Sequence, residues 1–246
     1  MSYDPAPPAV VPPNNLATIC QQIVSAGHIL TDFGILDAFG HVSARHPQKP
    51  DRFLMTKRVA PGQAIVDDVH EFGFDGELAD GSGVPLFGER YIHSAIYAAR
   101  PDVNSVIHSH STSIITSGLV PGHSLRPVCH MCGFLGTEVP VFEIRDVAGD
   151  ATNMLIQSHA LGSNLACSLG EAHVVLMRRH GCAVVGTTVP QAVYRAIYAE
   201  ENSRLQTAAE AIGSPTYLTE GEAKACEELA PFAIERSWNF WLSRVS

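Results

Sequence analysis

The stretch Ser-Val-Ile-His-Ser-His-Ser, residues 105–111, combines a strand pattern with two histidines, a side chain that often binds metals. Val106 and Ile107 are β-branched, which favours a strand, and polar residues follow them. Successive side chains of a strand point to opposite faces, so His108 and His110 point the same way, about 7 Å apart along the strand. The stretch therefore predicts a strand that runs out of the core and ends in a pair of ligands.

One further histidine, His180, stands before a glycine in the apolar segment LMRRHGCAVVG, residues 176–186. Neutral imidazole nitrogens bind zinc and other borderline divalent ions, and catalytic sites commonly use three protein ligands and keep one position open. A single histidine beside aliphatic residues is more often an ordinary core or surface residue, but three together favour a site. His108, His110 and His180 therefore predict a divalent metal centre, with Mn²⁺ and Zn²⁺ both compatible.

The chain of 246 residues is long enough for one large α/β domain or two small ones, and no linker rich in Pro, Gly or Ser divides it. Charged residues make up 17% of the chain, against about 25% in an average soluble protein. This low charge density fits a surface covered by another subunit, or a large monomeric core. The net charge of −9 argues against a nucleic-acid partner. Without a glycine-rich phosphate loop or a nucleophile elbow, nucleotide binding and serine hydrolysis have little support.

The first residues, 1–14, are rich in proline and lack the basic and apolar regions of a targeting peptide. We expect an extended tail here that packs on a neighbouring subunit, followed by a single domain over 15–246. We also expect no membrane segment and a cytoplasmic location.

Only one of the possible cysteine pairs has a spacing associated with metal or redox chemistry. Cys129 and Cys132 form a C-x-x-C pair, while the other four cysteines are isolated. One such pair without a second is weak evidence for zinc or redox chemistry. We interpret the pair as small buried apolar residues.

The apolar spacing predicts an opening helix over 16–33, and three short antiparallel strands between 41 and 80 with a hairpin turn at Asp75-Gly76. A proline ends the next helix, over 89–100. Strands in the middle of the chain with helices around them imply a layered α/β architecture. Further helices are expected over 111–119, 153–169, 190–212 and 220–241, and further strands over 105–110, 139–144, 173–179 and 182–186.

Three segments stand in a recognisable order along the chain. They are GHVSARH at 40–46, ERYIHSAIYAARPDVNSVIHSHS at 89–111, and RRHGCAVVG at 178–186, which precedes a helix containing Ala192 and Arg195. Together they resemble the class II aldolase/adducin family, over nearly the whole chain from residue 16 to about 213. The resemblance implies a three-layer α/β/α fold around a largely antiparallel sheet, and a homotetramer with active sites at subunit interfaces.

The resemblance also implies roles for individual residues. By motif position, His108, His110 and His180 hold the divalent metal, and Glu89 takes the place of the family's acid/base carboxylate. We expect Glu89 to be at most a weak ligand when substrate is bound, because a carboxylate ligand weakens the pull of the ion on an anionic substrate.

The departures from the family's sugar-phosphate aldolases concern the substrate. Those enzymes bind phosphate with a G-N-x-S loop, a Thr-x-x-Gly turn and two serines before the catalytic Glu, whereas this chain has GHVS at 40–43 and Leu-Phe-Gly at 86–88. Phe87 suits a flat apolar or aromatic ring instead. The tyrosine that donates a proton in the aldolases falls near His130-Met131, so His130 replaces it or the donor is missing.

The segments LRPVCHMCGFLG at 125–136 and FLMTKRVAPG at 53–62 resemble a branch of the family that decarboxylates hydroxylated aromatic acids, such as 3-hydroxy-2-methylpyridine-4,5-dicarboxylate and dihydroxyphthalates. Arginine is well suited to bind a second carboxylate through two parallel hydrogen bonds. The alternative for each basic side chain in the candidate set is an ordinary surface charge or a loop anchor. The candidate substrate contacts are His41, Ser43, Arg45, Lys57, Arg58, Phe87, Arg126 and Met131.

The sequence therefore predicts a metal-dependent decarboxylase of a hydroxylated pyridine or benzene dicarboxylate. Glu89 is the first candidate for proton transfer, and His130 or His41 the second. Two alternatives stay open. One is a retro-aldolase that acts on a non-phosphorylated hydroxy-keto acid, and the other is a non-catalytic scaffold similar to adducin.

Overall fold

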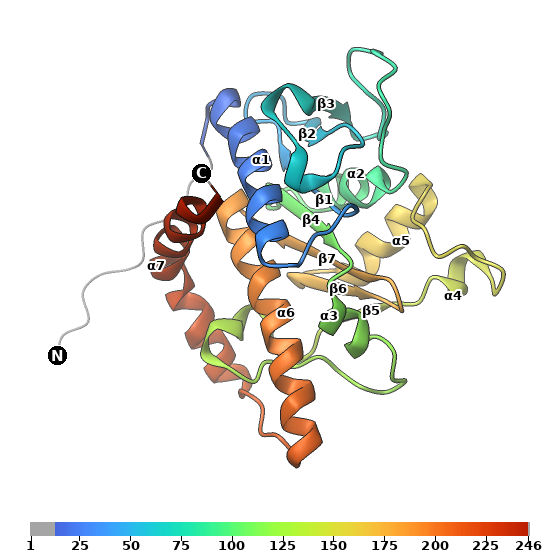
Figure 1. Ribbon diagram of the computed structural model, residues 1–246. Helices are drawn as coiled ribbons and strands as arrows, with labels where there is room; N and C mark the ends of the chain where they lie inside the picture. The colour runs from blue at the N-terminus through green and yellow to red at the C-terminus, as the bar shows by residue number, and fades with distance from the viewer. Residues whose placement is uncertain (1–12, 246) are drawn as a thin grey trace.

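The computed structural model describes residues 13–245, so the predicted tail over 1–14 lies almost entirely outside the described residues (Figure 1). Within them the chain forms a seven-stranded sheet in the order β3-β2-β1-β4-β7-β6-β5. Neighbouring strands are antiparallel except for the parallel pair β5 and β6. The strands are β1 (His41–Arg45), β2 (Arg52–Thr56), β3 (Val69–Gly73), β4 (Ser105–Ser109), β5 (Val141–Phe142), β6 (Val174–Met177) and β7 (Gly181–Gly186).

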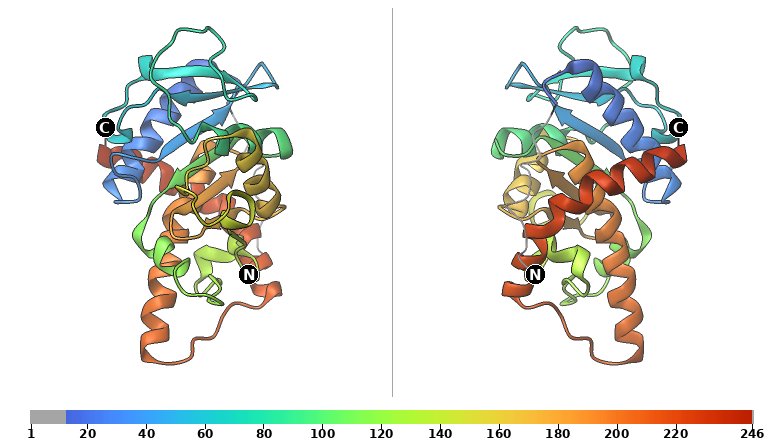
Figure 2. Two further views of the ribbon diagram at one scale, coloured as in Figure 1. Left: turned by 90° about the vertical axis from the view of Figure 1, so that its right-hand side faces the viewer. Right: turned by 90° about the vertical axis from the view of Figure 1, so that its left-hand side faces the viewer.

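Helices cover both faces of the sheet, as Figures 1 and 2 show. Three of them pack on one face, where they contact sheet residues such as Ile107 and Val184. Two pack on the other face, against sheet residues such as Val106 and Val185. This confirms the predicted three-layer α/β/α fold with a largely antiparallel sheet. On the first face lie α1 (Leu16–Asp32), α6 (Val189–Ile212) and α7 (Glu220–Val245), and on the second lie α2 (Arg90–Ala99) and α5 (His159–Leu169).

The remaining helices are short and lie in the connections. They are α3 (Thr112–Ser117), α4 (Arg145–Ala148), and the 3-10 helices η1 (Pro61–Gln63), η2 (Val66–Asp68) and η3 (His130–Leu135). Within residues 13–245, no helix combines the length and the apolar character needed to cross a lipid bilayer.

The first helix and the hairpin agree closely with the sequence pattern. The side chain of Asn15 caps α1 by accepting a hydrogen bond from the backbone N–H of Thr18. Gly76 adopts a left-handed conformation at the predicted turn, with φ of 81°.

Two predicted elements are shortened the most. The helix predicted over 153–169 begins only at His159, because Met154 has a left-handed φ of 65° and Ser158 caps the helix. Before that cap, the Asn153 side chain accepts a hydrogen bond from the backbone N–H of Leu155, which favours a turn over a helix. The strand predicted over 139–144 retains only the two residues of β5.

The antiparallel order brings several strand ends to one edge of the sheet. β1 begins there at His41, β4 ends there at Ser109, and β7 begins there at Gly181, while β2 ends at Thr56 beside them. His41 and His108 are paired partners across β1 and β4. Because side chains alternate along β4, His108 lies on the same side as Val106, which is the side that α2 and α5 cover.

Candidate metal centre

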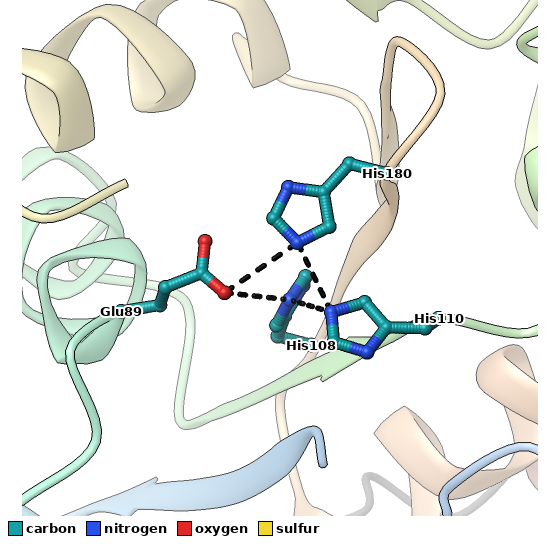
Figure 3. Close-up of side chains that lie close together, drawn as sticks. All are labelled: Glu89, His108, His110 and His180. Atoms are coloured by element: carbon teal, nitrogen blue, oxygen red, sulfur yellow. Dashed lines mark hydrogen bonds and ion pairs between the residues drawn. The ribbon is translucent and has the colours of Figure 1, made fainter. Parts of the chain in front are cut away.

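Four side chains from three separate segments converge at this edge of the sheet (Figure 3). One ligand atom from each of Glu89, His108, His110 and His180 lies within 4.8 Å of the others. The Nε2 atom of His110 is 3.0 Å from the Nε2 atoms of both His108 and His180. The Oε2 atom of Glu89 is 3.5 Å from the Nε2 atom of His108 and 3.4 Å from that of His180.

The turn between β6 and β7 places His180 beside the end of β4. Gly181 follows it with φ of 156°, and a Cβ atom at that position would overlap the carbonyl oxygen of Ser109. Only glycine therefore lets β7 start this close to β4. Arg179, directly before His180, has a left-handed φ of 59°, so the backbone on both sides of the ligand has an unusual conformation.

Backbone carbonyls hold two of the three imidazole rings. His108 Nδ1 lies 2.9 Å from the carbonyl oxygen of Cys182, and His180 Nδ1 lies 2.9 Å from that of Met154. A carbonyl oxygen only accepts, so each Nδ1 carries the proton and donates it. The Nε2 lone pairs of both rings are consequently free to face the centre of the cluster, as in many metal sites.

Glu89 is fixed by the backbone on its other side. It directly precedes α2, and its Oε1 atom accepts a hydrogen bond of 2.9 Å from the backbone N–H of Ile156. The same irregular segment thus supplies the carbonyl of Met154 to His180 and the amide of Ile156 to Glu89. The sequence pattern did not predict these two backbone contacts, because it predicted a helix over this segment.

The charges in the cluster suit a cation. Burial alone would raise the pKa of Glu89, but the adjacent imidazoles of His108 and His180 stabilise the carboxylate and hold that pKa well below its usual range. Burial, together with the neighbouring His108 and His180, lowers the pKa of His110 to about 4. The carboxylate is therefore anionic and the His110 ring neutral near neutral pH, which are the ligand forms of both groups.

The geometry of the donors fits a shared divalent ion. Two nitrogens that each lie about 2.1 Å from one ion are about 3.0 Å apart when the bonds meet at a right angle. The two 3.0 Å separations between imidazole nitrogens match this value. Three imidazoles and one carboxylate suit Zn²⁺, Mn²⁺ and similar ions.

A chain of short hydrogen bonds leads from this cluster into the core. His41 Nδ1 is 2.6 Å from His93 Nε2, His93 Nδ1 is 2.6 Å from Ser43 Oγ, and Ser43 Oγ is 2.7 Å from the hydroxyl of Tyr97. The sequence pattern missed His93 and Tyr97. They follow Glu89 by four and eight residues, so spacing along one helix face could have identified them.

Two phenylalanines border the cluster. The Phe87 ring centroid is 4.7 Å from that of His41, and the His41 centroid is 5.2 Å from that of His108. Phe39, which the sequence pattern also missed, is 64% exposed, with its ring centroid 6.4 Å from that of His110. The surroundings of the donors are thus partly aromatic.

Ser43 and Arg45 are engaged within the protein, Ser43 behind the site and Arg45 at the far end of β1. Ser43 is completely buried, and its hydroxyl is used by His93 and Tyr97, so the structure leaves it no surface for substrate. The guanidinium of Arg45 donates hydrogen bonds to four backbone carbonyls, which identifies it as an anchor for the loops around β1. Those carbonyls belong to Pro50, Tyr97, Arg100 and Val103.

Lys57 and Arg58 follow β2 at the edge of the sheet where His41 begins β1. Lys57 Nζ is 2.8 Å from Asp68 Oδ1. Arg58 is exposed, and its backbone N–H donates to the carbonyl oxygen of Pro85, two residues before Phe87. Its guanidinium has no partner within residues 13–245, so it is available for an anion.

The last three candidates lie on the opposite face of the sheet from the four donors. η3, which contains His130 and Met131, packs on α6 and α7, and its Phe134 is part of the core on that face. The Nδ1 atom of His130 is 3.2 Å from the sulfur of Cys226, and the Arg126 guanidinium lies over the Tyr217 ring. Within a single chain, these three residues therefore lie away from the metal cluster.

Comparisons with known proteins agree on the family. The sequence profile of the Class II Aldolase and Adducin N-terminal domain matches residues 21–207. The chain is 36% identical over 245 residues to the decarboxylase tropJ of Talaromyces stipitatus, which covers 90% of this chain and 92% of that protein. It is 30% identical over 207 residues to a 3,4-dihydroxyphthalate decarboxylase of Rhodococcus jostii, covering 78% of this chain and 80% of that protein.

A solved structure agrees on the fold. An aldolase II superfamily protein from Pseudomonas syringae superimposes with a TM-score of 0.77 at 21% identity, covering 96% of this chain and 94% of that one. The profile match extends from α1 into α6 and contains all four donors of the cluster. The chain belongs to the class II aldolase and adducin family.

Proposed function

We propose that this protein is a metal-dependent decarboxylase of a hydroxylated aromatic dicarboxylate, with the ion held by His108, His110 and His180. At the level of reaction class, the chain is an enzyme, a carbon–carbon lyase of the carboxy-lyase kind. The observation that carries the finer proposal is the convergence of four donors with partly aromatic surroundings.

The three imidazoles would hold the ion, and Glu89 would complete the anionic side of the site. A divalent ion bound there would supply Lewis-acid stabilisation of the charge that develops on the ring oxygen next to the departing carboxylate. Glu89, anchored by the amide of Ile156, accepts the proton of the ring hydroxyl, because an ionised carboxylate only accepts.

Loss of carbon dioxide leaves an electron pair on a ring carbon, which must receive a proton. His41 is the candidate donor that the structure favours over His130, because its ring lies beside His108. Its Nδ1 atom is engaged by His93, and its Nε2 atom has no hydrogen-bond partner within residues 13–245. This free nitrogen is the one we assign to the substrate.

The neighbouring side chains suit an aromatic acid with a second carboxylate. The exposed Phe39 lies beside His110 and the buried Phe87 packs against His41, so apolar rings adjoin the histidines. Among residues 13–245, Arg58 supplies an unpaired positive charge at the same edge of the sheet, whereas Lys57 is paired with Asp68. A guanidinium can hold a carboxylate with two parallel hydrogen bonds. No comparable set of hydroxyl groups for a phosphate precedes Glu89.

We further propose a homotetramer with active sites at subunit interfaces. This arrangement would explain why Arg126, His130 and Met131 lie on the other face of the sheet from the donors, since they would then serve the site of a neighbouring copy. Light scattering of the purified full chain tests this, and a monomer at working concentration would contradict it.

A panel of substrates distinguishes the proposal from a retro-aldolase and from an adducin-like scaffold. The protein, loaded with Mn²⁺ or Zn²⁺, is incubated with hydroxyaryl dicarboxylates and with non-phosphorylated hydroxy-keto acids. Release of carbon dioxide from the aromatic acids is expected. Release of an aldehyde or ketone instead identifies the aldolase, and no turnover with any compound identifies the scaffold.

Metal content tests the ligand assignment separately from activity. His108→Ala and His180→Ala are expected to lose the ion, as measured by elemental analysis of the purified variants. His159→Ala is the control, because the imidazole of His159 bonds to the carbonyl of Phe74 and lies outside the cluster. Full occupancy in either of the first two variants would refute the site.

A further inference from the structure

A second group of reactive side chains lies in η3, away from the candidate metal centre. The sulfur atoms of Cys129 and Cys132 are 3.1 Å apart, and both residues are free thiols. We propose that Cys129 and Cys132 are a redox pair, in which an oxidant such as hydrogen peroxide closes a reversible disulfide bond. This revises the interpretation of the two residues as ordinary apolar ones.

The backbone of the pair allows the sulfurs to approach. A disulfide bond is about 2.05 Å long, so the sulfurs must move closer by about 1 Å. Cys129 is extended, with φ of −142° and ψ of 159°, and Cys132 departs from helical geometry, with φ of −109° and ψ of 15°. His130 and Met131, between them, are exposed, and Cys129 packs against the core only partly buried, so this end of the turn is held less tightly than the buried Cys132.

The far end of the turn is fixed, which directs the movement to Cys129. A Cβ atom at Gly133 would collide with the backbone of Ala223 in α7, so η3 and α7 are in close contact there. Cys132 is completely buried and lies 3.3 Å from the carbonyl oxygen of Tyr198. Cys129 is only half-buried, and it is the sulfur that an oxidant in solution can reach.

The two thiols differ in acidity in the way a redox pair requires. The hydrogen bond from Cys132 lowers the pKa of Cys129 to about 7, against the opposing effect of burial. The same bond, together with burial, raises the pKa of Cys132. Cys129 is thus substantially a thiolate near neutral pH, and the thiolate is the form that attacks an oxidant.

The oxidation is balanced with one molecule of peroxide. The Cys129 thiolate attacks one peroxide oxygen, the O–O bond breaks, and a sulfenic acid and hydroxide form. The sulfur of Cys132 then attacks the sulfenic sulfur, the S–O bond breaks, and the thiol proton leaves with the hydroxyl group as water. Two thiols are oxidised to a disulfide, and the peroxide is reduced to water.

Closing the bond changes the position of the side chains between the two cysteines. His130 is held against the sulfur of Cys226 at 3.2 Å, and the carbonyl oxygen of Met131 accepts a long hydrogen bond of 3.5 Å from Tyr194. Pulling Cys129 toward Cys132 displaces both contacts. The oxidation state of the pair thereby sets where the turn presents His130.

Thiol mapping of the full-length protein tests the proposal. The reduced protein is treated with stoichiometric hydrogen peroxide, unfolded, alkylated and digested. We expect Cys129 and Cys132 to become protected together, linked in one peptide that has lost two hydrogen atoms, and to be released by dithiothreitol. Cys167, which is exposed and isolated, is the internal control and is expected to stay alkylatable.

Two further measurements keep the result independent of any effect on folding. In Cys132→Ser the peroxide is expected to leave a sulfenic acid on Cys129, which dimedone traps. An internal disulfide in that variant would show that Cys129 pairs with another cysteine and would overturn the proposal.

In the native protein, the rate of Cys129 alkylation is expected to rise with a midpoint near pH 7. A midpoint at the ordinary thiol value of about 8.5 would also overturn it.

Discussion

Three of the four residues of the candidate metal centre, Glu89, His108 and His180, use one side of the functional group for the protein and leave the other for the ion. His108 and His180 donate from Nδ1 to backbone carbonyls, and Glu89 accepts a backbone amide with one oxygen. These contacts fix the orientation of the side chains before any ion binds. Backbone groups hold the ligands more rigidly than mobile side chains can, because the sheet and the loops hold those backbone groups in place.

Glu89→Gln separates proton transfer from metal binding. The amide oxygen of glutamine can still accept the hydrogen bond from Ile156, so the side chain is expected to keep its place and the three imidazoles to keep the ion. Turnover is expected to fall by about 10²–10⁴-fold, because the group that accepts the proton is lost. Elemental analysis and steady-state kinetics on the same preparation check both halves. Loss of the ion along with turnover would show that Glu89 is an essential ligand instead.

Tyr97→Phe tests the buried chain behind His41. Removing the hydroxyl leaves Ser43 without one of its short hydrogen bonds, so the free energy of unfolding is expected to fall by about 1–2 kcal/mol. The metal content should stay unchanged. We expect kcat to fall and KM to change little, because only the positioning of His41 is affected.

Tyr91→Phe is the matched control for that variant. The hydroxyl of Tyr91 bonds at the surface to Glu77 and Arg90, so its loss should change stability by less than about 0.5 kcal/mol. Chemical denaturation measures both variants. Equal stabilities and unchanged kinetics in Tyr97→Phe would mean that the chain does not position His41.

At the scale of elements, the site depends on connections between strands and helices more than on the strands themselves. The β6–β7 turn carries His180, the start of α2 carries Glu89, and the segment before α5 supplies the backbone partners of both. Local patterns identified β4 and α2 correctly because their apolar spacing is regular. The segment before α5 was missed because Met154 adopts a left-handed conformation, which its own side chain does not favour.

Gly181→Ala tests the close approach of β7 to the end of β4. The added methyl group would overlap the carbonyl oxygen of Ser109, so one strand must move and His180 with it. We expect a loss of about 2–4 kcal/mol in unfolding free energy, together with reduced metal content. Gly213→Ala is the control, because nothing lies within 4 Å of a Cβ atom there. If the first variant is as stable as the control and holds the ion, the close approach has no role.

At the scale of the whole molecule, a bound ion would connect segments that are far apart in the sequence. Removing it with a chelator is expected to lower Tm, since an ion at 100 times its Kd stabilises the folded state by about 2.7 kcal/mol. For a chain of this size that corresponds to roughly 5–10 °C. Differential scanning calorimetry with and without Mn²⁺ or Zn²⁺ measures the difference. An unchanged Tm at saturating metal would contradict a site built from these three segments.

The sequence alone identified the family and the layered fold and singled out three histidines as candidate ligands, because spacing within a strand and the order of motifs can be read along the chain. Tertiary structure decided the rest. It revealed His93 and Tyr97 behind His41, showed that Ser43 and Arg45 are engaged within the protein, and placed His130 and Met131 on the far face of the sheet. These facts depend on which distant segments pack together, and burial and hydrogen-bond partners between distant segments leave no periodic trace in the sequence.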